Sequence, residues 1–190
     1  MLQPIPRDFS DITTTDQVTT EAPAAGLILL GVNSLLLSLY HAGFFPFGSQ
    51  VLGMCIFYGA TGMIATGLIA WKRHNVYGAV LSTAVGLFWI SLVAMVIMPI
   101  SGFGRAPQPS ALSSYLAFWG LFTSIFLTGA SRLGRELVIF LSMFAIFLML
   151  LAVGAAAGSP LINAIAGGEG IACGLVGIYA GALKLRNQSR

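Results

Sequence analysis

One long uncharged stretch, residues 24–44, carries three polar side chains near its middle, Asn33, Ser34 and Ser38. Amide and hydroxyl groups can donate hydrogen bonds to the oxygen atoms of a solute without carrying a charge. On a helical period of about 3.6 residues, one stripe of this stretch contains Gly26, Leu30, Asn33, Leu37 and His41. We interpret this stripe as one wall of a solute path. The alternative is that the polar groups bond to a neighbouring helix or to their own turn, as is common in membrane helices.

The composition of the chain is that of a membrane protein. Hydrophobic residues make up 57% of the 190 residues and charged residues only 8%, which is too little polar surface to cover a soluble globule. Helices of about 20 residues span the hydrocarbon layer. Six stretches have roughly that length and, apart from Glu169 in the last one, carry no charge, namely 24–44, 50–71, 77–98, 111–131, 137–157 and 161–183. The sequence therefore predicts an all-α integral membrane protein with six transmembrane helices.

The two ends of the chain differ from these stretches. Residues 1–23 are polar and lack the basic flank and apolar core of a signal peptide, so we expect a disordered cytoplasmic tail. The six-helix transmembrane domain is predicted over residues 24–185. A short basic cytoplasmic tail is predicted over residues 186–190.

Basic residues fall mostly on one side of the predicted membrane domain. When the helices alternate in direction, one side receives Arg7, Lys72, Arg73, Arg132, Arg135, Lys184, Arg186 and Arg190. The other side receives only Arg105. The positive-inside rule then places both termini in the cytoplasm, in a multi-pass protein of the cytoplasmic (inner) membrane. Lipid headgroups account for charges at helix ends, so we expect a lipid bilayer and no nucleic acid as partner.

No set of residues has the spacing of a catalytic or metal site. His41 and His74 fall near opposite ends of two neighbouring helices, and no Ser-His-carboxylate arrangement accompanies them. Cys55 and Cys173 lie in separate predicted helices, outside any Cys-x-x-Cys spacing. We therefore expect neither enzyme activity nor a cofactor or metal.

Glu169 is the one ionisable side chain that falls well inside a predicted helix. A carboxylate at such a depth is energetically expensive and suggests a function, here a proton-linked step. The alternative is that Glu169 faces a wet vestibule or a contact between subunits. No Lys or Arg falls inside a span. Neutral hydroxyl and amide groups are therefore what a carboxylate solute would meet.

Short motifs follow one another along about four fifths of the chain, from Gly26 to Tyr179. They include Gly43-Phe44-Phe45-Pro46, Ile56-Phe57-Tyr58-Gly59, Phe88-Trp89, Met98-Pro99, Trp119-Gly120 and Cys173-Gly174. In order and spacing these motifs resemble the acetate uptake transporter family, also called the succinate-acetate permease family. The resemblance implies six helices per protomer, a homo-hexameric ring and a separate path for small monocarboxylates through each protomer. It leaves open whether that path is an anion channel or a proton-coupled carrier.

Two regions depart from the pattern of that family. The family signature before the first helix reads Asn-Pro-Ala-Pro-Leu-Gly-Leu, whereas this chain has Glu21-Ala22-Pro23-Ala24-Ala25-Gly26-Leu27. Glu21 would repel an anion if it faced the path. The constriction of bacterial members is similar to a triad of Phe, Leu and Tyr, and the resemblance places it at Leu30, Phe144 and Val85. All three residues are apolar here, which keeps a hydrophobic gate but removes the tyrosine hydroxyl.

Together these observations predict transport of acetate and similar small monocarboxylates through a path in each protomer. The predicted constriction is formed by Leu30, Val85 and Phe144. The predicted polar lining consists of Gly26, Asn33, Ser34, Ser38, Tyr58, Thr83 and Thr123. One alternative function is a channel for another small solute, such as formate, succinate or a small amide. A second alternative is a membrane scaffold that transports nothing.

Overall fold

Within the part of the chain that the structure describes, six helices are long and apolar enough to cross a membrane. The computed structural model describes residues 24–46, 48–131 and 134–188. The helical segments are α2 (Ala24–His41), α3 (Ser49–Met54), η1 (Cys55–Gly62), α4 (Met63–Lys72), α5 (Val76–Ile100), α6 (Pro109–Ala130), α7 (Arg135–Ala157) and α8 (Pro160–Gln188). α3, η1 and α4 follow one another directly and form the second span, Ser49–Lys72. The predicted all-α architecture with six transmembrane helices is confirmed.

Two helix ends differ from the predicted spans by more than two residues. α2 ends at His41 and not at residue 44, because the chain turns at Gly43, whose φ is +85°. α8 stays helical through residues 186–188, which the sequence assigned to the tail. Arg186 lies in its last turn, where a positive charge is favoured by the helix dipole. The predicted tail 1–23, including Glu21, lies outside the described residues.

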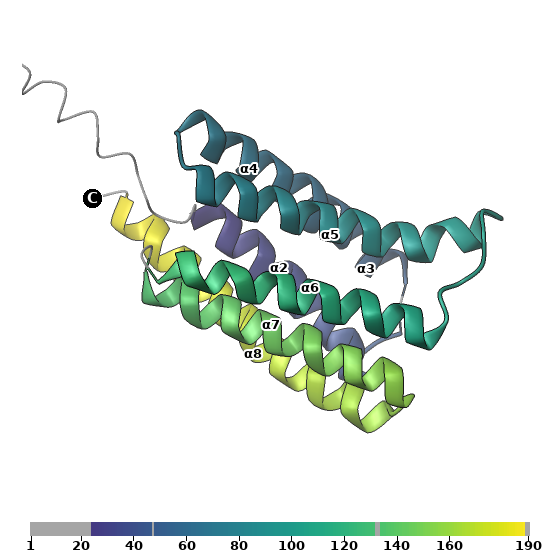
Figure 1. The fold of residues 1–190 in the computed structure, drawn as a ribbon. Helices are drawn as coiled ribbons and strands as arrows, with labels where there is room; N and C mark the ends of the chain where they lie inside the picture. Colours follow the sequence, from purple (N-terminus) through teal and green to yellow (C-terminus); the bar gives the residue numbers. More distant parts are fainter. Residues whose placement is uncertain (1–23, 47, 132–133, 189–190) are drawn as a thin grey trace, which may run out of the picture.

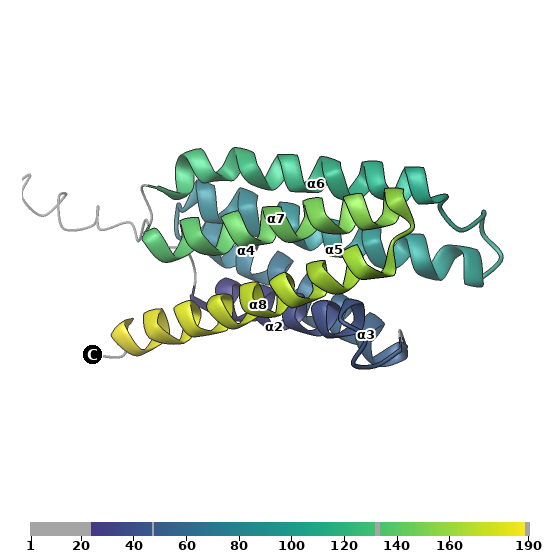
Figure 2. The ribbon, with the colours of Figure 1, turned by 90° about the horizontal axis from the view of Figure 1, so that it is seen from below.

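The long helices run side by side in a single bundle (Figures 1 and 2). α2 packs against α8 and against the second span, while α7 packs against both α6 and α8. The largest buried side chains come from α5 and α7 and include Trp89, Phe88, Phe140, Phe144 and Phe147. Side chains on the outside of the bundle are apolar too, among them Leu68, Leu121 and Ile125. Such a surface suits contact with lipid chains.

Glycine allows α2 and α8 to approach each other closely. A Cβ atom built on Gly31 would lie 2.7 Å from the backbone nitrogen of Ile178 and 2.8 Å from the carbonyl oxygen of Gly174. Both distances are shorter than van der Waals contact, so a larger residue at position 31 would push the two backbones apart. Small residues commonly mediate this kind of approach between membrane helices.

The second span contains a π-helical segment, η1, in its middle. The turns of a π-helix are wider than those of an α-helix, and such segments are frequent at functional sites. The buried residues of η1 are Cys55, Gly59 and Ala60, and the segment packs against α2 and α5. A Cβ atom at Gly59 would lie 2.6 Å from Cγ of Trp89. Glycine at this position therefore lets the indole of Trp89 reach the π-helical turn.

Basic residues gather at one end of the bundle, which we call the basic end. Its described members are Lys72, Arg73, Arg135, Lys184 and Arg186. The end of α4, the start of α7 and the end of α8 carry these residues and lie at the same end in the ribbon (Figure 1). Arg105 lies in the loop between α5 and α6, at the opposite end, which we call the far end.

We predict that Gly31→Ala lowers the unfolding temperature of the purified protein in detergent by several degrees. Its Cβ atom would overlap the backbone of α8, and overpacking of this kind costs about 1–3 kcal/mol. The matched control is Gly168→Ala on α8, because a Cβ atom there has nothing within 4 Å. Equal unfolding temperatures for the two variants would contradict this account of the α2–α8 contact.

Candidate functional site: two cavities and the neck between them

A small cavity opens among the helices in the half of the bundle near the basic end. Its volume is about 20 Å³. Residues from α2, α4, α5 and α7 line it, among them Gly26, Leu27, Leu30, Met63, Leu81, Ser82, Phe140 and Leu141. We call it the basic-end cavity. Of the predicted lining residues, Gly26 lies here.

A larger cavity of about 250 Å³ occupies the other half of the bundle. Its lining comes from α2, α3, η1, α5, α6 and α7 and includes Leu37, His41, Cys55, Val93, Leu116 and Leu151. We call it the far-end cavity. It shares Tyr40, His41 and Leu112 with a vestibule of about 470 Å³ that also contains Asn163. The far-end cavity therefore adjoins a wider and more polar vestibule at these three side chains.

The turn of each helix that separates these two cavities forms a neck. α2, α5 and α7 each line the basic-end cavity with an earlier part and the far-end cavity with a later part. The second span runs the other way, so that Cys55 lines the far-end cavity and the later residue Met63 lines the basic-end cavity. The residues between the two linings are Asn33 and Ser34 of α2, Gly59 and Ala60 of η1, Val85, Phe88 and Trp89 of α5, and Phe144, Phe147 and Leu148 of α7. All ten are buried. The two cavities thus end on opposite sides of one buried layer.

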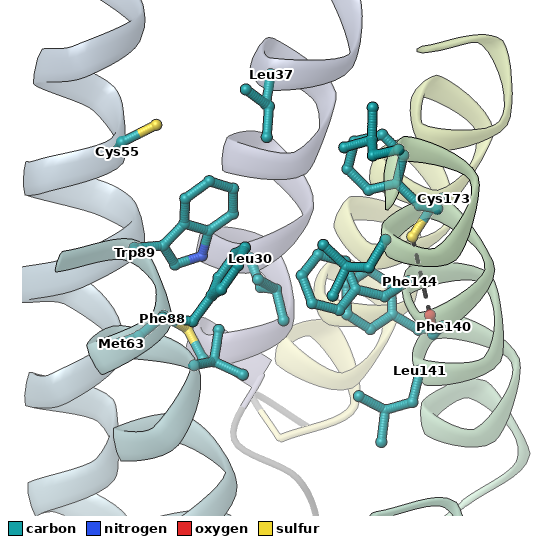
Figure 3. Close-up of a cluster of buried hydrophobic side chains, with 14 of the residues drawn as sticks. Leu30, Leu37, Cys55, Met63, Phe88, Trp89, Phe140, Leu141, Phe144 and Cys173 are labelled. Atoms are coloured by element: carbon teal, nitrogen blue, oxygen red, sulfur yellow. Dashed lines mark hydrogen bonds between the residues drawn. The ribbon is translucent and has the colours of Figure 1, made fainter. Parts of the chain in front are cut away.

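Aromatic rings fill much of the neck. Phe88 and Phe144 meet edge to face, with ring centroids 6.2 Å apart, and Phe88 also contacts the Trp89 ring at 4.9 Å. Figure 3 shows Leu30 in the space between the Trp89 side and the Phe144 side of the bundle. Narrow apolar constrictions of this kind can gate a pore by excluding water.

The three residues predicted to form the constriction are all buried in the bundle. Leu30, Val85 and Phe144 expose 3%, 5% and 1% of their surface. Leu30 lines the basic-end cavity at its neck side, whereas Val85 and Phe144 belong to the neck itself. The structure thus buries all three positions, and Phe144 contacts Phe88, which follows Val85 by three residues on α5.

The predicted polar residues of α2 are fully buried but differ in their bonding. The hydroxyl of Ser38 donates to the carbonyl oxygen of Ser34 at 2.6 Å, within its own helix. Thr123 of α6 does the same, donating to Trp119 at 2.8 Å. The carboxamide of Asn33 and the hydroxyl of Ser34 make no hydrogen bond of ordinary geometry within the described residues, although the Asn33 side chain interacts with the thiol of Cys55. Bonding to the same helix therefore accounts for Ser38 and Thr123 but not for Asn33 and Ser34.

Gly26 is the one predicted lining residue found in the lining of either cavity, and two of the others, Thr83 and Tyr58, lie toward the outside of the bundle. Thr83 lines an outer groove between α4 and α5, together with the exposed side chains of Leu68 and Trp71. Side chains two residues apart on a helix point in nearly opposite directions. Because Val85 points into the bundle, Thr83 points outward. Tyr58 is 41% exposed, because Cys55, Gly59 and Ala60 occupy the buried face of η1.

Glu169 lies on α8, outside the cavities described above. One of its carboxylate oxygens is buried without a hydrogen-bond partner among the described residues. The next residue, Gly170, faces Ser38 of α2 and Phe147 of α7. Glu169 is therefore near the contact of three helices in the far half of the bundle, but it lines neither of the two cavities. Within the described ranges, no cluster of His, Cys, Asp or Glu side chains could hold a metal ion.

Trp89 is the site residue that the sequence did not single out. Its side chain is fully buried, and its indole nitrogen has no partner among the described residues. A buried tryptophan usually finds a hydrogen-bond partner for this N–H group. The available signal in the sequence was a tryptophan in the middle of an apolar span. A hydropathy analysis counts such a tryptophan as one more apolar residue and does not indicate its polar N–H group.

With this geometry in place, comparisons with known proteins identify the family. A model described as the GPR1/FUN34/yaaH family matches residues 10–190. The chain belongs to the GPR1/FUN34/yaaH family. The family resemblance inferred from the sequence motifs is thereby confirmed.

Relatives within the GPR1/FUN34/yaaH family cover most of the chain. The succinate-acetate/proton symporter SatP of Escherichia coli is 37% identical over 164 residues, which span 86% of this chain and 87% of SatP. An uncharacterized protein of Methanothermobacter thermautotrophicus is 36% identical over 188 residues, 95% of this chain and 91% of its own length. A solved structure of the bacterial acetate channel SatP superposes with a TM-score of 0.85 at 35% identity, covering 88% of this chain and 93% of SatP.

We predict that a small thiol reagent, such as a methanethiosulfonate, labels Cys55 much faster than Cys173 in the purified protein. Cys55 lines the far-end cavity, whereas the Cys173 thiol is packed against α7 and donates to the carbonyl oxygen of Phe140 at 3.8 Å. Intact-protein mass spectrometry of Cys55→Ala and Cys173→Ala measures each site separately. Equal labelling of the two cysteines would contradict an open far-end cavity.

Proposed function

We propose that this protein transports acetate and similar small monocarboxylates across the cytoplasmic membrane, through a path within each protomer. The observation that carries the proposal is the pair of cavities that end on one buried neck. Membership of the family supports it, because relatives carry the names succinate-acetate/proton symporter and acetate channel. The named relatives are transport proteins, so we propose no enzyme activity.

The proposed path runs from the vestibule through the far-end cavity, the neck and the basic-end cavity. Leu30, Val85 and Phe144 act as the apolar gate, which opens when water enters the neck. The described residues that line the two cavities include no Lys or Arg. A carboxylate therefore meets only neutral donors on this route, so we expect weak binding and fast passage.

The proposed orientation follows from charge. Cytoplasmic ends of membrane helices carry an excess of Lys and Arg, so the basic end is proposed to be cytoplasmic and the far end to face outward. Both chain termini would then be cytoplasmic. By the family resemblance we also propose that six protomers assemble into a homo-hexamer, each with its own path.

Uptake of radiolabelled acetate into proteoliposomes tests the proposed function. The transport proposal predicts uptake well above that of protein-free liposomes and competition by unlabelled acetate. Uptake equal to the protein-free background would refute it and favour a membrane scaffold. An imposed pH gradient separates the two mechanisms, because a proton-coupled carrier accumulates acetate against its own gradient and an anion channel does not.

We predict that Val85→Tyr narrows the range of transported solutes. A tyrosine ring would occupy the neck, so we expect uptake of butyrate to fall by roughly tenfold relative to acetate, the usual scale of discrimination by pocket size. The matched control is Val76→Tyr at the start of the same helix, where the side chain is exposed. An unchanged ratio of butyrate to acetate uptake in Val85→Tyr would place Val85 outside the path.

Glu169 is proposed as the proton-linked group, and Glu169→Gln is its test. If the carboxyl carries the coupled proton, the amide variant keeps downhill acetate uptake, because Glu169 does not line the path. It loses the response to an imposed pH gradient. Measurement of uptake at acid and neutral pH, with and without the gradient, checks both points. A gradient response equal to that of the unsubstituted protein would exclude Glu169.

A further inference from the structure

Three side chains of the neck hold polar atoms that the described protein leaves without a hydrogen-bond partner. They are the carboxamide of Asn33, the hydroxyl of Ser34 and the indole nitrogen of Trp89. Each of these three side chains has an exposed fraction of 0%. A buried polar group without a partner is costly, and native proteins seldom keep one without a reason.

Two of these groups come together next to Gly59. A Cβ atom built there would lie 2.9 Å from Cδ1 of Trp89, the ring atom bonded to the indole nitrogen, and closer still to the side-chain nitrogen of Asn33. Gly59 lies in the π-helical segment, where the turn is wide. Groups from α2 and α5 thus meet where η1 provides no side chain of its own.

Ser34 adds a third donor on the same turn of α2. Its carbonyl oxygen accepts the hydroxyl of Ser38, but its own hydroxyl remains unbonded within the described chain. Leu30 lines the basic-end cavity and Leu37 the far-end cavity. The turn that carries Asn33 and Ser34 lies between them, so these donors stand where a solute would leave one cavity for the other.

The donors among the three groups fit the carboxylate of the proposed function, although Oδ1 of Asn33 is an acceptor that also has no partner among the described residues. The indole N–H of tryptophan can only donate a hydrogen bond, and amide and hydroxyl groups can donate as well. A cation would find no acceptor at Trp89, whereas a carboxylate offers two acceptor oxygens. The surrounding rings of Phe88 and Phe144 suit a short apolar tail. Hydrogen bonds to a charged group are stronger than those between neutral groups.

We propose that Trp89, Asn33 and Ser34 form a carboxylate-binding site at the neck, which replaces part of the hydration shell of the solute as it crosses. Nε1 of Trp89 and the side-chain nitrogen of Asn33 donate to the carboxylate oxygens, and Ser34 completes the site. This inference deepens the proposed function and takes its substrate class from it.

Binding is tested through the fluorescence of Trp89. The chain has three tryptophans, so Trp71→Phe combined with Trp119→Phe leaves Trp89 alone. Sodium acetate is expected to change the Trp89 emission in a saturable way, and sodium chloride at equal concentration is not. The control protein, with Trp89→Phe and Trp119→Phe, keeps only Trp71, which is exposed on the outer groove. It should not respond to acetate. If the Trp89 emission does not change with acetate, or changes equally with chloride, the proposed binding site is wrong.

Transport kinetics provide a second test. We expect Trp89→Phe and Asn33→Leu each to raise the KM for acetate by about tenfold, because a hydrogen bond to a charged group contributes roughly that factor in affinity. Ser124→Ala is the control, since that hydroxyl bonds to its own helix at Gly120. Asn33→Leu should unfold at the same or a higher temperature than the unsubstituted protein, because it removes an unsatisfied buried polar group. A lower unfolding temperature with unchanged KM would make Asn33 a structural residue.

These experiments separate the site from the function. If the unsubstituted protein takes up acetate but the variants keep its KM and the Trp89 emission stays flat, the site is wrong and the proposed function stands. If acetate saturates the Trp89 emission but no uptake occurs, the proposed function is wrong and the binding site stands.

Discussion

A polar group buried within a membrane finds no water, so it must bond inside the protein or remain costly. Ser38 and Thr123 meet this demand by donating to carbonyl oxygens of their own helices. Asn33, Ser34 and Trp89 do not meet it within the described protein. These three lie in the layer that separates the two cavities, and they are the groups that we propose bind a passing carboxylate.

Several features of the fold coincide at this layer. The π-helical turns of η1, the absence of a side chain at Gly59 and the aromatic contact of Phe88 with Phe144 all occur there. The glycine contact between Gly31 and α8 holds α2 in place two residues before Asn33. The proposed apolar gate and the proposed hydrogen-bond donors thus depend on the same close contacts between helices, at Gly31 and Gly59. Helix packing is in this way linked to the proposed transport.

The spans could be predicted from the sequence, but the direction in which each side chain points could not. Charge-free stretches bounded by basic residues locate helices because lipid excludes charge. Lipid is as apolar as the protein interior, so hydropathy does not distinguish the face of α5 that carries Val85 from the face that carries Thr83. The exposure of Tyr58 could not be predicted for a further reason, since nothing local in the sequence indicates the π-helical turns around it. Trp89 was missed because its polar atom matters only once its neighbours are known.

The central claim is that the neck keeps donors free for a carboxylate. An experimental structure of the hexamer or protomer determined in sodium acetate tests it most directly. The account predicts density for a carboxylate within hydrogen-bond distance of Nε1 of Trp89 and of the Asn33 carboxamide, between the two cavities. It would be contradicted by a structure in which both groups bond to protein atoms and the layer between the cavities holds no solute.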